Sequence, residues 1–168
     1  MDSKIRNQII EWVSKHLGDS FVFRKHQLET IEDIISNIVN KVHHTHIIEA
    51  PTGSGKSLLC IISAGVLAEY YDMKSYILCS DLYLYSQYED FIRINKLDFG
   101  ALKGQTGNYT CALNKEDMKN ADCKMAGLSW ASMFSPATIE KYGYDCAYTC
   151  EYVKARKKAI KAAWSNRA

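Results

Sequence analysis

The sequence lacks any apolar run that could cross a lipid bilayer. Its longest nearly apolar stretch, residues 58–68, is far shorter than the about 20 residues that a spanning helix needs. The amino terminus is polar and no signal-like apolar segment follows it. Internal repeats and low-complexity tracts are missing too. These absences exclude a membrane-spanning protein. They predict an intracellular chain of about one ordinary domain, cytoplasmic in a bacterium or phage and nuclear in a eukaryote.

Closely spaced pairs of the Cys-x-x-Cys kind are also missing, although the chain has six cysteines. In an intracellular protein these are reduced thiols or metal ligands rather than disulfides. Cys60 and Cys79 fall in an apolar predicted helix and strand, where small buried thiols are common. The other four lie in a weakly periodic segment that a metal centre would help to order: Cys111, Cys123, Cys146 and Cys150. Zinc and an iron–sulfur cluster both accept four thiolates, and unligated thiols are a third interpretation.

Net charge is small, +2, but it is unevenly spread along the chain. Residues 101–168 hold 11 Lys and Arg against 6 Asp and Glu, whereas residues 1–100 hold 10 against 13. A basic helix is predicted over residues 151–164, with Lys154, Lys158 and Lys161 on one face. The excess of positive charge in residues 101–168 suggests a polyanionic partner, most simply nucleic acid. A solvated lysine-rich face accounts for the charge equally well.

A glycine-rich loop is the most informative motif in the chain. It consists of Ala50, Pro51, Thr52, Gly53, Ser54, Gly55, Lys56 and Ser57. The two glycines allow a tight turn whose N–H groups converge on a phosphate. Lys56 is placed to contact the β- and γ-phosphates, and Ser57 offers a hydroxyl to Mg²⁺. A strand-like segment precedes the loop and a helix follows it, so the pattern predicts a nucleoside triphosphate site.

Hydrophobic periodicity divides the chain into alternating helices and strands. Helices are predicted over 4–17, 25–40, 56–70, 82–92 and 151–164, and short strands over 46–49, 75–79 and 99–102. Such alternation predicts an α/β fold with a parallel sheet covered on both faces. The pattern changes after Lys103. We therefore expect an ATP-binding α/β domain over residues 1–103 and a mostly helical or irregular, cysteine-rich domain over residues 104–165.

Three stretches accompany the loop at characteristic places in the chain. Phe-Arg-Lys-His-Gln occupies residues 23–27, Lys-Gly-Gln-Thr-Gly-Asn-Tyr-Thr-Cys occupies residues 103–111, and residues 150–156 are Cys-Glu-Tyr-Val-Lys-Ala-Arg. Together with the loop, these segments resemble the XPD/DinG-type iron–sulfur DNA helicases of superfamily 2. The resemblance covers residues 23 to about 166, and the stretch that leads into Cys111 is its most specific part.

This resemblance implies a RecA-like P-loop sheet, part of the first motor domain, that is interrupted by a [4Fe–4S] domain. It implies ATP and Mg²⁺ at the loop, with Lys56 and Ser57 as the catalytic contacts and Gln27 as an adenine contact. It also implies that the four insertion cysteines, Cys111, Cys123, Cys146 and Cys150, hold the cluster. The implied partner is single-stranded or forked DNA.

One part of an ATPase is missing from the sequence. Hydrolysis needs an acidic element, usually Asp-Glu at the end of a strand, that holds Mg²⁺ and prepares the attacking water. The chain has no Asp-Glu dipeptide, and it has no second motor domain. We therefore expect the amino-terminal part of an ATP-dependent DNA helicase, or a shortened relative, which hydrolyses ATP very slowly by itself.

Two other functions fit the same residues. One is a non-catalytic module that binds nucleic acid or protein, with a vestigial P loop and a metal site of four cysteines. The other is a zinc-bound P-loop kinase, although no acceptor-site motif is visible. ATP turnover stimulated by single-stranded DNA separates the helicase from the binding module, and zinc in a metal analysis favours the kinase.

Overall fold

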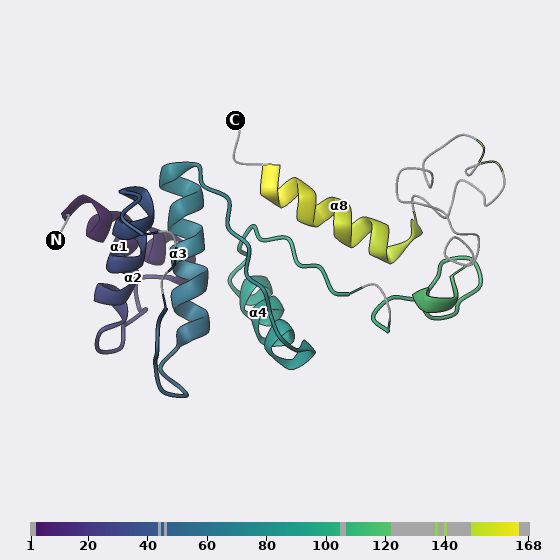
Figure 1. The fold of residues 1–168 in the computed structure, drawn as a ribbon, viewed down its shortest axis with the longest axis horizontal. Helices are drawn as coiled ribbons and strands as arrows, with labels where there is room; N and C mark the ends of the chain where they lie inside the picture. The colour runs from purple at the N-terminus through teal and green to yellow at the C-terminus, as the bar shows by residue number, and fades with distance from the viewer. Residues whose placement is uncertain are drawn as a thin grey trace. The chain divides into compact units, whose positions relative to one another are not determined.

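The computed structural model describes residues 3–43, 45, 47–104, 107–121, 137, 140 and 149–164. The elements along these residues are α1 (Ser3–Leu17), α2 (Gln27–Val39), α3 (Lys56–Tyr71), α4 (Leu82–Ile94), the 3₁₀ turn η1 (Met118–Asn120) and α8 (Glu151–Trp164) (Figure 1). The chain divides into two compact units, one built on residues 1–98 and the other on residues 99–165. None of the described helices is long and apolar enough to cross a membrane.

The core of the first unit is a packed cluster of α1, α2 and α3, each of which contacts the other two (Figure 1). The apolar stripe of each helix supplies the buried side chains, which include Ile5, Ile9, Trp12, Ile31, Ile35, Ile61, Ile62 and Val66. Each such side chain contributes about 1.5–3 kcal/mol by leaving water. Packing is closest where α1 meets α3, since a Cβ at Gly65 would lie 2.2 Å from Cζ2 of Trp12. This core fixes α3, and therefore the loop at its amino end.

The predicted parallel sheet is wrong. In the described part of the chain the pairing of extended segments is limited to one isolated antiparallel bridge, between Thr110 and Asp117. Residues 47–49, 75–79 and 99–102 run without regular structure, and His46 lies outside the described residues. Ile47 is 93% exposed and Leu78 is 92% exposed. Apolar composition favours an extended backbone, but a sheet also needs partner strands that satisfy the backbone N–H and C=O groups.

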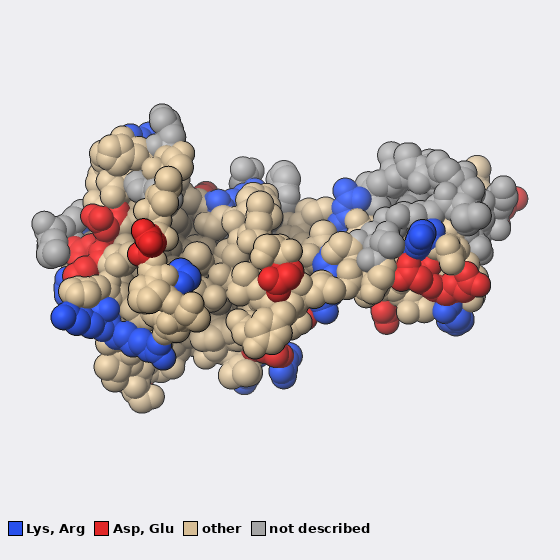
Figure 2. Space-filling view, turned by 60° about the horizontal axis from the view of Figure 1, so that its bottom comes forward, with Lys and Arg blue, Asp and Glu red and all other residues tan. Residues whose placement is uncertain are grey.

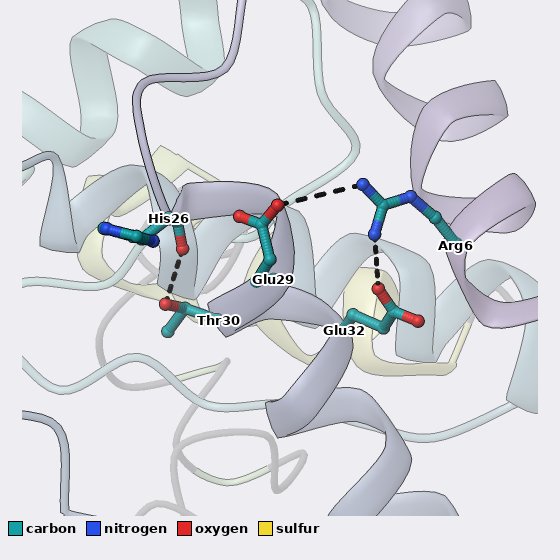
Figure 3. Close-up of polar contacts among 5 residues, drawn as sticks. All are labelled: Arg6, His26, Glu29, Thr30 and Glu32. Atoms are coloured by element: carbon teal, nitrogen blue, oxygen red, sulfur yellow. Dashed lines mark hydrogen bonds and ion pairs between the residues drawn. The ribbon is translucent and has the colours of Figure 1, made fainter. Parts of the chain in front are cut away.

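An arginine bridges α1 to α2 at the edge of this core (Figure 3). Arg6 Nη1 donates to Glu32 Oε2 at 3.0 Å, and its Nη2 lies 3.8 Å from Glu29 Oε1. The Glu32 side chain is only 6% exposed, and no partner for its other oxygen, Oε1, lies among the described residues. In the same view Thr30 donates to the carbonyl of His26 at 2.7 Å, within the first turn of α2. Arg6 is thus the counter-charge of a nearly buried carboxylate.

Replacing Arg6 by alanine is expected to lower the free energy of unfolding by about 2 kcal/mol, because Glu32 would stay buried without its counter-charge. Urea denaturation followed by circular dichroism measures this loss. Arg93→Ala is the matched control: its pair with Asp90 is 71% and 62% exposed, so the loss there should stay below about 0.5 kcal/mol. Equal losses in the two variants would contradict a special role for the Arg6 pair.

The second unit has a small core of its own. Cys111, Met118, Ala121, Cys150 and Val153 are buried together, with Tyr109 and Tyr152 packed against them. The two tyrosine rings meet edge to face, with centroids 5.4 Å apart.

Gly100 lies directly against α8 in the same unit, since a Cβ there would come within 2.3 Å of Cα of Ala159. The described part of this unit is therefore held together by a small apolar cluster and by the close contact between the backbone at Gly100 and α8.

Candidate functional site

The loop between residues 50 and 55 turns tightly into α3. Gly53 and Gly55 have φ values of 81° and 88°, in the left-handed region that glycine adopts without strain. Ser54 N donates to the Pro51 carbonyl at 3.2 Å, which closes the turn. Gly55 is the N-cap of α3, so the unpaired N–H groups of the helix start directly behind the loop. The backbone of the loop therefore has the tight turn and the following helix that the sequence predicts.

The ammonium of Lys56 lies against the loop. Lys56 Nζ donates to the carbonyl of Ala50 at 2.6 Å and to that of Pro51 at 3.0 Å. An ammonium has three N–H donors, so these two bonds leave one for an incoming anion. Lys56 is exposed. The loop thus presents a positive charge and the amino end of a helix at the same place.

Gln27 ties the start of α2 to the loop. Its Nε2 donates to the Ser54 carbonyl at 2.8 Å, and its Oε1 accepts from the Arg24 N–H at 2.9 Å. It is only 5% exposed, and a Cβ on Gly55 would come within 2.5 Å of Nε2. The structure therefore places Gln27 against the loop backbone, a contact that the sequence-based role toward adenine does not include.

Two residues of this site escaped the sequence reasoning. One is Arg24, whose guanidinium donates through Nη1 to the Gly53 carbonyl. The sequence held a signal for it, because Arg24 lies three residues before Gln27 in the stretch 23–27 that accompanies the loop. The other is Tyr88, on α4. No spacing in the sequence connects it to the loop.

Ser57 opens onto an apolar cavity of about 220 Å³ beside the loop. The cavity is lined by Gly55, Ser57, Leu58, Ile61, Gln87, Tyr88 and Phe91. Tyr88 and Phe91 reach this cavity from α4, whereas Ser57 belongs to the first turn of α3. The pKa of Tyr88 is raised above its usual range, mainly by burial, with Cys60 and Cys79 nearby adding to the rise and Ser57 opposing it. The phenol is therefore protonated at neutral pH.

The structure brings two of the four candidate metal ligands into one cluster. Cys111 and Cys150 are 3% and 2% exposed within the apolar core of the second unit. Cys123 and Cys146 lie outside the described residues. No group of three or more His, Cys, Asp or Glu that could hold a metal is found within the described ranges. Two free thiols enclosed by apolar side chains are nevertheless donors of the kind that an iron–sulfur cluster uses.

Cys60 and Cys79 are more exposed than the sequence predicts. Cys60 on α3 is exposed, and Cys79 is of intermediate exposure, so neither is the buried core thiol that the apolar pattern suggests.

The basic helix forms as predicted, over Glu151–Trp164. Lys154, Lys158 and Lys161 are exposed, while Val153, on a different face of the helix, is buried in the cysteine-containing core. On the face shown in Figure 2, basic side chains are interspersed with acidic ones and with uncharged surface. Charge on that face is mixed, so the case for a polyanionic partner depends on the spacing of these three lysines.

Comparison with known protein families gives a match over a large part of the chain. The family model ResIII, the res subunit of type III restriction enzymes, matches residues 20–141. The matched range contains Arg24, Gln27, the whole loop and Tyr88, and it continues past Cys111. No curated protein and no solved structure was found to match the chain.

Proposed function

The chain belongs to the ResIII family, a helicase-like region of superfamily 2 type, and on this basis we propose that it is an ATP-binding part of a DNA helicase. The family supports a nucleotide-binding, nucleic-acid motor function in general. The finer assignment, to the XPD/DinG type with an iron–sulfur domain, is part of the proposal.

The single observation that carries the proposal is the position of Lys56. Its ammonium lies on the loop carbonyls of Ala50 and Pro51, at the amino end of α3. A triphosphate that enters there meets a positive charge, backbone N–H groups and the positive end of a helix dipole. Ser57 would hold Mg²⁺, which screens the phosphate charge when bound. Gln27 and Arg24 hold the loop backbone in the shape that this contact requires.

The cysteine-containing core is proposed to carry the cluster. Cys111 and Cys150 fit, because both thiols are buried in one small apolar cluster, and thiolates in such surroundings are the usual ligands of [4Fe–4S] clusters. Cys123 and Cys146 would complete the set. Because metal binding can substitute for a hydrophobic core, the cluster would also stabilise a unit whose described core is small.

Single-stranded or forked DNA is proposed to bind along α8. Three exposed lysines at spacings of four and three residues lie on one side of this helix, apart from the face that holds the buried Val153. Phosphate contacts by lysine require only such a row of accessible ammonium groups and carry no sequence preference.

Changing Lys154, Lys158 and Lys161 together to glutamine is expected to weaken single-stranded DNA binding about equally for all sequences. Each lost phosphate contact removes counterion release, so the slope of log K against log salt should flatten by about two units. Fluorescence anisotropy between about 50 and 200 mM salt measures both effects. The control changes the same number of exposed lysines in the first unit, Lys4, Lys41 and Lys96. A triple α8 variant with the parent's affinity and slope would show that DNA does not bind along α8.

A binding module without turnover is the second candidate, and the missing Asp-Glu dipeptide favours it. ATP turnover by this chain, measured with and without single-stranded DNA, separates them: stimulated turnover would exclude the binding module.

A further inference from the structure

The apolar cavity beside the loop has no part in holding phosphates. It measures about 220 Å³ and is lined by residues of α3 and α4, both within the first unit. Pockets that enclose a whole drug-sized ligand measure about 300–1,000 Å³, so this one suits a single planar ring system. Gly55 and Ser57 belong both to the start of α3 at the loop and to the wall of the cavity. A nucleotide whose phosphates lie at the loop therefore has the cavity directly beside it.

Helix α4 gives the cavity an aromatic wall. Tyr88 and Phe91 are three residues apart, and Gln87 and Phe91 are four apart, so the three side chains share one side of the helix. Both rings are of intermediate exposure, and α4 has no buried residue. Ile61 of α3, by contrast, is only 1% exposed. The described structure thus leaves part of the aromatic wall uncovered.

The chemistry of this wall fits a nucleobase. Bases stack on aromatic side chains, and an amide side chain can pair with the N6 donor and the N7 acceptor of adenine. Gln87 supplies such an amide beside the two rings, and it is exposed. Gln27 has less to offer a base, because it is 5% exposed and both ends of its amide are already hydrogen-bonded.

We propose that the cavity is the base subsite of the nucleotide site, with Tyr88 and Phe91 stacking on adenine and Gln87 at its edge. This inference rests on the proposed function, in which the triphosphate lies at Lys56. The base would displace water from the partly exposed rings, and the apolar surface that it covers would add to the affinity that the phosphates supply. ATP should therefore bind more tightly than inorganic tripolyphosphate, which has no base.

The first test compares a ligand that has a base with one that lacks it. Phe91→Leu keeps an apolar side chain in the cavity and removes the ring. ATP should bind this variant about five- to tenfold more weakly than the parent, whereas tripolyphosphate should keep the parent's affinity. Displacement of an ATP analogue labelled on its ribose, with Mg²⁺ present, gives both affinities. Tyr83→Leu is the control, because Tyr83 lies on the same helix, is 77% exposed and does not line the cavity.

Two results of this test would overturn the base subsite. One is an unchanged affinity of Phe91→Leu for ATP. The other is an equal loss for ATP and tripolyphosphate, since that would indicate a distorted loop rather than a lost contact with the base.

A second measurement uses the unchanged parent chain. A base stacked on Tyr88 and Phe91 should shift the NMR signals of their rings, followed with carbon-13-labelled tyrosine and phenylalanine and assigned with Tyr88→Phe and Phe91→Leu. ATP should produce these shifts and tripolyphosphate should not. Identical shifts with both ligands would overturn the base subsite and leave the phosphate site standing. If the parent bound neither ligand, the proposed function would fail, and the base subsite with it.

Discussion

Replacing Lys56 by alanine is expected to weaken binding of a fluorescent ATP analogue by at least about 100-fold. The ammonium lies within hydrogen-bond distance of the carbonyls of Ala50 and Pro51, at the place where the triphosphate would lie. Hydrogen bonds to charged groups contribute about 1.5–3 kcal/mol each, and a lysine at this position contacts two phosphates. The measurement is a fluorescence titration with Mg²⁺ present, supported by circular dichroism to show that the helices are intact.

Lys41→Ala is the matched control for this experiment. It removes the same charge from an exposed position that follows α2, and it should leave the affinity unchanged. If Lys56→Ala bound the analogue as tightly as the parent, the loop would be a structural turn and the proposed function would fail.

Replacing Cys150 by serine is expected to remove the colour of the protein and most of its iron. Anaerobically purified parent protein should be brown, absorb broadly at about 400 nm and contain acid-labile sulfide, as thiolate-bound iron–sulfur clusters do. Cys150 is 2% exposed beside Cys111 and Val153. Because this position is buried, a water molecule cannot readily take the place of the lost sulfur ligand. Loss of the cluster should also increase proteolysis within residues 104–150, because the metal would substitute for a core there.

Cys79→Ser is the control for the metal experiment, because Cys79 lies outside the cysteine-containing core. This variant should keep its iron and colour. A colourless parent protein with one bound zinc would contradict the cluster and revive the zinc alternatives. Free thiols without metal, after strictly anaerobic purification, would show that Cys111 and Cys150 serve only as small apolar side chains.

Local sequence determined the helices and the loop. The helices at Ser3–Leu17, Gln27–Val39, Lys56–Tyr71, Leu82–Ile94 and Glu151–Trp164 lie within two residues of the predicted bounds. Each depends on interactions between residues three and four apart, which the spacing of apolar side chains encodes directly. The loop could be predicted from the local sequence for a similar reason. Its two glycines accept positive φ, and Lys56 and Ser57 open the helix that follows.

Tertiary structure alone decided the contacts between distant segments. Gln27 reaches Ser54 across 27 residues, Tyr88 lines the same cavity as Ser57 from another helix, and Cys111 is buried with Cys150. The prediction of a sheet was wrong for the same reason. Strand-like segments such as 47–49 and 75–79 become strands only when other segments pair with them. Periodicity encodes which face of a segment is apolar, but it does not encode which other segment covers that face. The free energy of burying the face arises only when the segments pack together in the folded chain.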